Sequence, residues 1–281
     1  MRTKAFLLCI VLLFAGIYRM QAQADFYSIQ ALGHRYIYNS DYFDEPRELQ
    51  VYLSGVDGSL KNDSLLAIYV FDAQYPPTYN LFCSTFELIY PNTPCVIVGI
   101  SNSDRQSELT PPFTDSISVK GYSNPGHGKE MLLSLTNEII PFIEKKYHTS
   151  HDRVLAGHSL GGTFVSYAMM EYPALFPHII AISPNYNYSK NMMIDKLRHF
   201  TDTYRGEKEL YVYLANGHKD KTEEKFKPMI KEACSIIGKN NKIELQYDSL
   251  NIDKHSATIF EGYYRGLLKM ASVIKSTEQQ K

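Results

Sequence analysis

The residue pattern with the clearest chemical meaning lies near the middle of the chain, where residues 157–161 read Gly-His-Ser-Leu-Gly. This G-x-S-x-G spacing is typical of a serine on a tight strand-to-helix turn, where side chains at the two glycine positions would clash. The pattern arises by chance in roughly one chain of this length in ten, so its context decides its meaning. An apolar strand pattern at 153–156 precedes it, and a helical pattern from about Leu160 to Met170 follows. We therefore predict that Ser159 is a nucleophile and not an incidental serine in a glycine-rich turn.

A serine hydroxyl becomes a strong nucleophile when a base removes its proton and an acidic side chain orients that base. With a G-x-S-x-G turn the three residues follow the order Ser, then Asp or Glu, then His. The predicted strand 209–215 runs into a short polar turn that ends at Asp220, which is the predicted acid. Glu223 and Glu224 are the alternatives, but both fall in the first turn of the predicted helix 222–237, where acidic residues usually face solvent.

His255 is the predicted base. It lies in the loop 253–256, between the last predicted strand, 242–249, and the final predicted helix, 257–274. It is also the only histidine that follows His218, which itself is too close to the predicted acid. The order of residues along the chain therefore leaves His255 as the candidate.

Acyl transfer also needs N–H donors for the negative oxygen that develops on the substrate carbonyl. The backbone N–H of Leu160, directly after the nucleophile, is one predicted donor. The second is expected in the loop after the strand that ends at Asp72, which makes Ala73 or Gln74 the candidate; we assign Ala73. This chemistry uses no metal ion and no cofactor, and we expect neither.

The elements around these residues alternate between strand and helix. Continuous apolar runs predict buried strands at Leu65–Phe71 and Cys95–Ile100, and residues 27–38 and 47–54 predict a first antiparallel pair. Further strands are predicted at 154–157, 179–183, 209–215 and 242–249, and helices at 129–147, 160–170, 190–200, 222–237 and 257–274. Such alternation indicates an α/β fold with a mostly parallel central sheet and helices on both faces. The irregular stretch 103–127 is either a wall of the substrate cleft or a simple surface loop.

The N-terminus has the pattern of a signal peptide. Arg2 and Lys4 precede an apolar run from Ala5 to Ile17, and Ala22-Gln-Ala24 supplies a small-x-small cleavage site. The apolar run is shorter than the roughly 20 residues that span a bilayer. We predict a signal peptide at 1–24, a single catalytic domain at 25–281, and export to the periplasm or the exterior without stable membrane insertion. An uncleaved membrane anchor is the alternative.

The composition narrows the classes of partner. The formal net charge is −1 and the charges are spread along the chain, so there is no basic face for nucleic acid. Beyond the predicted signal peptide the chain keeps Cys83, Cys95 and Cys234. This odd number fits neither a disulfide framework nor a zinc site. Cys95 is expected to be buried, and the sequence does not decide between one disulfide and none. The oligomeric state is not indicated by the sequence.

With these residues placed, the mature chain resembles the esterase D-like (putative esterase) family of α/β hydrolases, which includes feruloyl esterases and enterochelin-type siderophore esterases. The resemblance is carried by residues 47–53, 69–72, 97–105 and 138–147, and most specifically by Arg-Val-Leu-Ala-Gly-His-Ser-Leu-Gly-Gly at 153–162. It implies an α/β-hydrolase fold, with Ser159, Asp220 and His255 at the positions of the family's catalytic residues.

Two positions depart from the family pattern. Ala73 stands where relatives have glycine, and Tyr186 and Tyr188 follow a Ser-Pro pair after which relatives often have tryptophan. We expect these two tyrosines to line the acyl or alcohol pocket. Arg105 is expected either to meet an anionic or hydroxyl-rich substrate or to form a structural ion pair.

The resemblance implies a serine esterase whose substrate is a small-molecule or oligosaccharide ester, such as an acylated sugar, a phenolic ester or a siderophore-like ester. A second hypothesis is acyl transfer to a sugar acceptor. A third is a non-catalytic binding protein on a hydrolase scaffold, against which the intact Ser, Asp and His in order argue.

Overall fold

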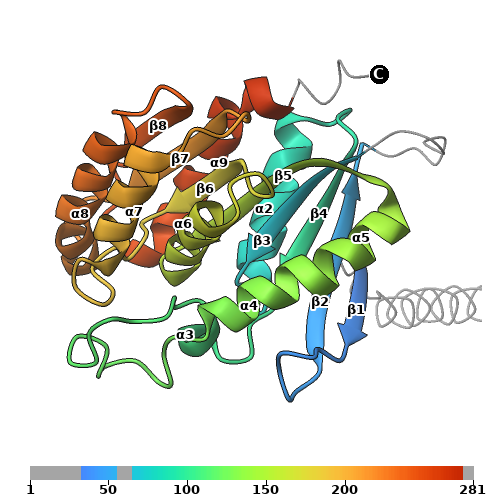
Figure 1. Ribbon diagram of the computed structural model, residues 1–281. Helices are drawn as coiled ribbons and strands as arrows, with labels where there is room; N and C mark the ends of the chain where they lie inside the picture. The colour runs from blue at the N-terminus through green and yellow to red at the C-terminus, as the bar shows by residue number, and fades with distance from the viewer. Residues whose placement is uncertain (1–32, 56–64, 275–281) are drawn as a thin grey trace, which may run out of the picture. The chain divides into compact units, whose positions relative to one another are not determined.

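The computed structural model describes residues 33–55 and 65–274 of the 281-residue chain. Within these residues a single sheet of eight strands forms, in the order β1-β2-β4-β3-β5-β6-β7-β8 (Figure 1). Across the sheet, the six strands β4, β3, β5, β6, β7 and β8 are each parallel to their neighbours. β2 is antiparallel to both β4 and β1, and β1 forms the edge. The bounds are β1 His34–Tyr38, β2 Arg47–Ser54, β3 Leu65–Phe71, β4 Cys95–Ile100, β5 Thr149–His158, β6 His178–Ile182, β7 Leu210–Asn216 and β8 Ile243–Ser249.

Helices cover both faces of the sheet because the central strands are apolar on both sides. Neighbouring residues of one strand enter different cores: Leu155 packs with the helices of one face, and Val154 packs with those of the other. The first face carries α4 Gly128–Ser134, a π-helical turn Leu135–Ile139, α5 Ile140–Tyr147, α6 Leu160–Glu171, α7 Met192–Thr203 and α8 Lys221–Ile237. The second carries α2 Pro76–Ile89 and α9 Thr258–Lys269, and the short helices are α3 Arg105–Glu108 and the 3₁₀ turn η2 His255–Ala257.

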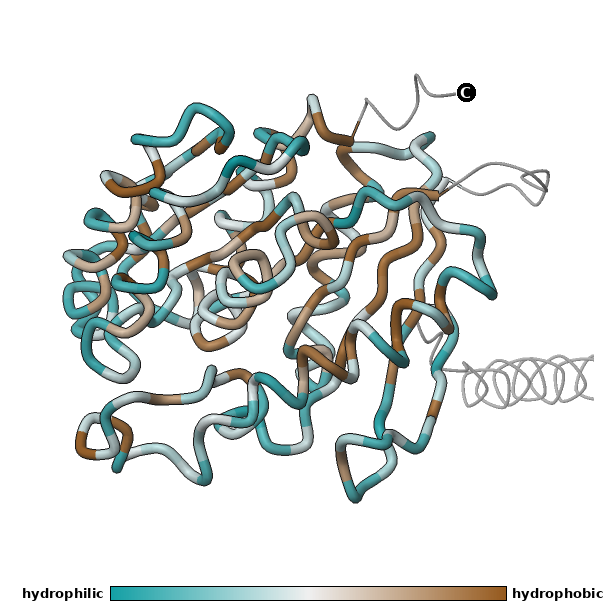
Figure 2. Tube along the Cα trace, in the orientation of Figure 1, coloured by the Kyte–Doolittle hydropathy of each residue, from teal (hydrophilic) through white to brown (hydrophobic). Residues whose placement is uncertain are grey.

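The hydropathy of the chain follows this layering. Figure 2 shows hydrophobic residues concentrated along the central strands and hydrophilic residues on the outer turns of α7 and α8. On the second face the rings of Phe82 from α2 and Tyr263 from α9 meet edge to face, with centroids 4.9 Å apart. The predicted α/β fold with a mostly parallel sheet is therefore confirmed.

Several details differ from the sequence-based expectations. The stretch 103–127 contains the short helix α3 instead of being irregular throughout. The three cysteines of the described part of the chain are free, and Cys83 and Cys95 are both buried. The predicted signal peptide, residues 1–24, lies outside the described residues and stays a prediction. Among the residues that the structure does describe, no helix has the length and apolarity needed to cross a bilayer.

The parallel topology places several chain reversals at one edge of the sheet. β3, β5 and β6 are each followed there by a residue with positive φ: Asp72 at 67°, Ser159 at 57° and Ser183 at 46°. A positive φ is uncommon at residues other than glycine, and residues with this conformation are frequent at functional sites. The carboxyl edge of β3, β5 and β6 is therefore the place to look for chemistry, as is general for open parallel sheets.

A buried ion pair secures the loop that follows β4. Arg47 on β2 donates from Nη1 to Glu108 Oε1 at 2.8 Å and from Nη2 to Glu108 Oε2 at 2.5 Å. Glu108 also accepts from the Asn102 side chain at 2.7 Å and from the Asp104 backbone N–H at 3.0 Å. Both side chains of the pair are almost fully buried. The pair therefore holds the segment that carries Arg105 against the sheet.

We predict that Glu108→Ala lowers the free energy of unfolding by about 3–5 kcal/mol, because it leaves the Arg47 charge buried without its partner. Urea denaturation followed by circular dichroism measures this change. The matched control is Arg35→Ala, which breaks the pair with Glu48 at a site where the arginine side chain is 67% exposed. We expect that control to change stability by no more than about 1 kcal/mol. Equal effects of the two variants would contradict the assignment of Glu108 as the anchor of this loop.

Candidate active site

Ser159 lies on a strained turn between β5 and α6. Its backbone has φ 57° and ψ −117°, a conformation that non-glycine residues rarely adopt. The two motif glycines make the turn possible: a Cβ on Gly157 would lie 2.4 Å from the carbonyl carbon of Gly161, and a Cβ on Gly161 would lie 3.2 Å from Asp72 Oδ2. The turn therefore projects the Ser159 side chain at the sheet edge, close to the reversal that follows β3.

His255 lies in the 3₁₀ turn before α9, and its ring is held by a buried carboxylate. Nδ1 of His255 is 2.5 Å from Oε1 of Glu223. The Glu223 side chain is fully buried, and its other oxygen accepts the backbone N–H of Gly217 at 2.6 Å. Phe226, one turn further along α8, packs edge to face on the same imidazole, with centroids 5.6 Å apart. The ring of His255 is therefore fixed by two side chains of α8, and one of these is itself held by the backbone that follows β7.

Asp220 does not make the predicted contact with this ring. It is the N-cap of α8 and accepts the backbone N–H of Thr222 at 2.7 Å and that of His255 at 3.3 Å. These backbone hydrogen bonds, that from Thr222 first, lower the pKa of the Asp220 carboxyl. The carboxylate on the ring is that of Glu223, one of the two alternatives from the same helix.

A signal for Glu223 is present in the sequence. The buried residues of α8 are Glu223, Phe226, Ile230, Ala233, Ile236 and Ile237. Extending the apolar stripe at 226, 230, 233 and 237 towards the N-terminus by helical spacing reaches position 223 and not 224. Position 223 is thus on the inner face, where a carboxylate requires partners.

Ser159 and His255 line one cleft of about 330 Å³. Its walls come from the turn after β3, the loop after β4, the serine turn, and the start of α9, and its lining residues are Asp72, Tyr75, Thr78, Arg105, His158, Ser159, His255, Ser256 and Ile259. Among the described residues, no group of His, Cys, Asp and Glu could hold a metal ion.

The predicted second oxyanion donor is already engaged. The backbone N–H of Ala73 donates to the Ile100 carbonyl at 3.0 Å, within the contact between the ends of β3 and β4. This bond removes Ala73 from the donors available to a substrate. Gln74, its neighbour in the same turn, is the remaining backbone candidate, while Leu160 is the first residue of α6, where N–H groups have no partner within the helix.

Arg105 both joins segments and faces the cleft. Its Nε donates to Asp72 Oδ1 at 2.6 Å, and its Nη2 donates to Asp72 Oδ2 at 2.9 Å and to the His158 carbonyl at 3.1 Å. The side chain remains 23% exposed in the cleft lining. No described residue accepts from Nη1, which keeps two N–H donors on the guanidinium.

Tyr186 and Tyr188 are not in the cleft lining, contrary to expectation. Both are buried, and their hydroxyls contact Ser166 Oγ at 2.7 Å and the Pro111 carbonyl at 3.0 Å, respectively. Burial raises the pKa of Tyr188 to about 12. Tyr188 also packs edge to face on Tyr122 of the stretch 103–127, so it anchors this loop from inside. The aromatic residue of the cleft is Tyr75, which the sequence analysis did not single out.

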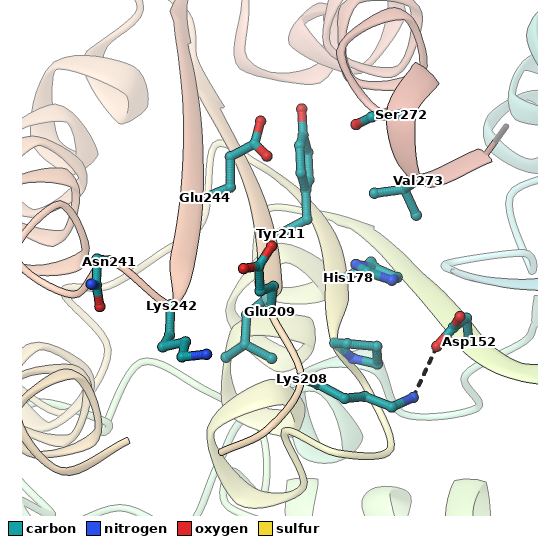
Figure 3. A pocket seen from close by; sticks show the side chains of 12 residues that line it. Asp152, His178, Lys208, Glu209, Tyr211, Asn241, Lys242, Glu244, Ser272 and Val273 are labelled. Atoms are coloured by element: carbon teal, nitrogen blue, oxygen red, sulfur yellow. Dashed lines mark hydrogen bonds and ion pairs between the residues drawn. The ribbon is translucent and has the colours of Figure 1, made fainter. Parts of the chain in front are cut away.

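A larger cavity, of about 710 Å³, lies at the opposite edge of the sheet, where β6, β7 and β8 begin (Figure 3). Lys208 and Asp152 form an ion pair of 2.9 Å in its wall, and burial lowers the pKa of His178 to about 4. The one serine in its lining, Ser272, lies in a helical stretch and not on a strained strand-to-helix turn like that of Ser159. The smaller cleft, which holds Ser159 and His255, is therefore the candidate active site.

The parallel sheet, the layered helices and the serine on its strand-to-helix turn define an α/β-hydrolase fold. A model of the Putative esterase family matches residues 40–265, and the chain belongs to this family. The IroE-like serine hydrolase of Shewanella oneidensis has the same fold, with a TM-score of 0.75 over 85% of this chain and 80% of that chain, at 19% identity.

Two curated relatives from Bacillus subtilis match shorter stretches. The uncharacterised protein YbbA is 34% identical over 96 residues, which cover 33% of this chain and 38% of YbbA. The ferri-bacillibactin esterase BesA is 30% identical over 138 residues, which cover 44% of this chain and 48% of BesA. The chain thus spans less than half the length of the curated relatives that it matches.

We predict that Gly157→Ala lowers the free energy of unfolding by about 1–3 kcal/mol, because the new methyl group would overlap the backbone of Gly161. Urea denaturation is the measurement. Gly121→Ala is the control, since a Cβ there has no atom within 4 Å. A Gly157→Ala variant as stable as this control would contradict the expected overlap between the new methyl group and the backbone of Gly161.

Proposed function

We propose that this protein is a serine carboxylic-ester hydrolase in which Ser159 is the nucleophile, His255 the general base and Glu223 the acid that orients the base. The observation that carries the proposal is the 2.5 Å contact between His255 Nδ1 and the buried Glu223, at a cleft that also holds Ser159. A carboxylate on Nδ1 leaves Nε2 as the proton acceptor, which is the tautomer that a serine nucleophile requires.

The reaction follows from these roles. The Ser159 oxygen attacks the ester carbonyl while His255 Nε2 takes the hydroxyl proton, and the resulting imidazolium is stabilised by Glu223. His255 then gives the proton to the leaving alcohol, and an acyl group remains on Ser159. A water molecule, deprotonated by His255, releases the acid and restores the serine. None of these steps requires a cofactor.

The negative oxygen of each tetrahedral intermediate requires donors that are already in place. We assign the backbone N–H groups of Leu160 and Gln74 to this role. Leu160 is supported by its position at the start of α6, where the helix dipole also favours negative charge. Gln74 is assigned because the N–H of its neighbour Ala73 already donates to the Ile100 carbonyl.

The cleft favours an ester with a polar or aromatic acid over a long-chain lipid. Arg105, whose charge is paired with Asp72, keeps N–H donors at Nη1, and Tyr75 presents an exposed aromatic ring. A guanidinium of this kind binds carboxylate or phenolate oxygens. The substrate class that fits is a phenolic or siderophore-like ester, in line with the ferri-bacillibactin esterase activity that names BesA.

We predict that purified wild-type protein is labelled stoichiometrically by a fluorophosphonate probe and that Ser159→Ala and His255→Ala abolish the labelling, because the probe reports an activated serine. Intact-mass spectrometry measures the covalent adduct. Ser256→Ala, which changes another serine of the cleft, is the control and should keep the adduct on Ser159. A folded wild-type protein that is never labelled would overturn the hydrolase proposal and favour a binding protein.

We predict that Glu223→Gln lowers kcat by about 10²–10⁴-fold, because an amide no longer supports the imidazolium and the required tautomer. Asp220→Asn is the matched control from the same helix turn and should lower kcat by less than about 10-fold. Steady-state hydrolysis of a p-nitrophenyl ester by the two variants provides the comparison. The reverse ranking would assign the acid to Asp220.

A further inference from the structure

His158, the second residue of the G-x-S-x-G motif, contacts the backbone of His255. Its Nε2 is 3.0 Å from the His255 carbonyl oxygen. A carbonyl oxygen can only accept, so Nε2 of His158 carries the proton and donates. The two imidazole rings also lie against each other, with centroids 4.7 Å apart and planes inclined by 38°.

Thr258 completes a small network around the same carbonyl. Its hydroxyl donates to the His255 carbonyl at 2.7 Å and accepts from Ser183 Oγ at 3.2 Å. His158 Nε2 lies 3.1 Å from the Thr258 oxygen, so its N–H is shared between two acceptors. One assignment of protons therefore satisfies every contact. The His255 carbonyl accepts from the His158 ring, from the Thr258 hydroxyl and, within η2, from the Thr258 backbone N–H.

We propose that His158 is a positioning residue that holds the backbone of His255, and thereby the imidazole, in place beside Ser159. The inference rests on the proposed function. Glu223 fixes the ring at Nδ1 and Asp220 contacts the backbone N–H, but neither holds the carbonyl side of the residue. Thr258, which donates to this carbonyl, belongs to the same turn as His255, whereas His158 donates to it from the residue directly before the nucleophile. The His158 side chain therefore ties the base to the nucleophile.

The charge state of His158 suits this role. Burial, the neighbouring His255 and the Arg105 guanidinium together lower the pKa of His158 to about 3. The charged groups that face it are His255 and Arg105, and Arg105 is itself paired with Asp72. His158 therefore stays neutral at neutral pH. A cation there would repel the imidazolium that forms on His255 during the reaction.

The test compares His158→Leu, which removes the donor, with His158→Gln, whose side-chain amide can donate from a similar position. We expect His158→Leu to lower kcat by roughly 10- to 100-fold with KM changed less than about threefold, because misplacing the base slows the chemical step more than it changes substrate binding. His158→Gln should recover a large part of the lost kcat, and its acid limb of kcat/KM against pH should match that of the wild type. His199→Leu, at an exposed histidine of α7, is the control and should leave kcat unchanged.

Two results would overturn the proposal. One is a folded His158→Leu variant with the kcat of the wild type, and the other is a His158→Gln variant no more active than His158→Leu. Imidazole ¹⁵N NMR of the unmodified protein gives a readout that needs no turnover: His158 should be a neutral Nε2–H tautomer from pH 5 to 8. A protonated His158 or an Nδ1–H tautomer in that range would also refute it. Absence of fluorophosphonate labelling in the wild type, with the NMR signature present, would instead refute the hydrolase proposal and leave the structural contact intact.

Discussion

The hydrogen bond between the buried Glu223 and His255 is the interaction on which the rest of the site depends. A carboxylate without exposure to water is costly unless hydrogen bonds replace its hydration. Glu223 uses one oxygen for the Gly217 N–H at the end of β7 and the other for the His255 ring. This shared carboxylate therefore ties the end of β7, the first turn of α8 and the turn before α9 into one unit.

The nucleophile belongs to a second unit, formed by the ends of β3, β4 and β5. Arg105 links these ends, since one guanidinium bonds the carboxylate of Asp72 and the carbonyl of His158. The loop that carries Arg105 is itself secured by Arg47 and Glu108 beneath it. His158 is the element that both units share, because its backbone is held by Arg105 and its ring holds His255.

The features of the fold and site that the sequence predicted correctly are those that depend on residues close together in the chain. The alternation of apolar runs and helical patterns predicted the layered sheet, since burial on both faces leaves continuous apolar strands such as β3 and β4. Glycine spacing predicted a strained turn at Ser159, because the clash that glycine avoids lies within five residues of the chain. The expectations for Ala73, Tyr186 and Tyr188 were wrong for the opposite reason. Their surroundings come from β4, α6 and the loop 103–127, which are distant in the sequence.

The sequence by itself determined the kind of fold, the residue on the tight turn, and the order in which an acid and a histidine follow it. Periodicity, glycine spacing and chain order are local properties and can be read without coordinates. Only the tertiary structure decided which carboxylate reaches the imidazole. Asp220 and Glu223 lie three residues apart, and the packing of α8 directs Asp220 to backbone N–H groups and Glu223 into the interior. The structure also brought His158 to the far side of His255, a contact across 97 residues that no local pattern encodes.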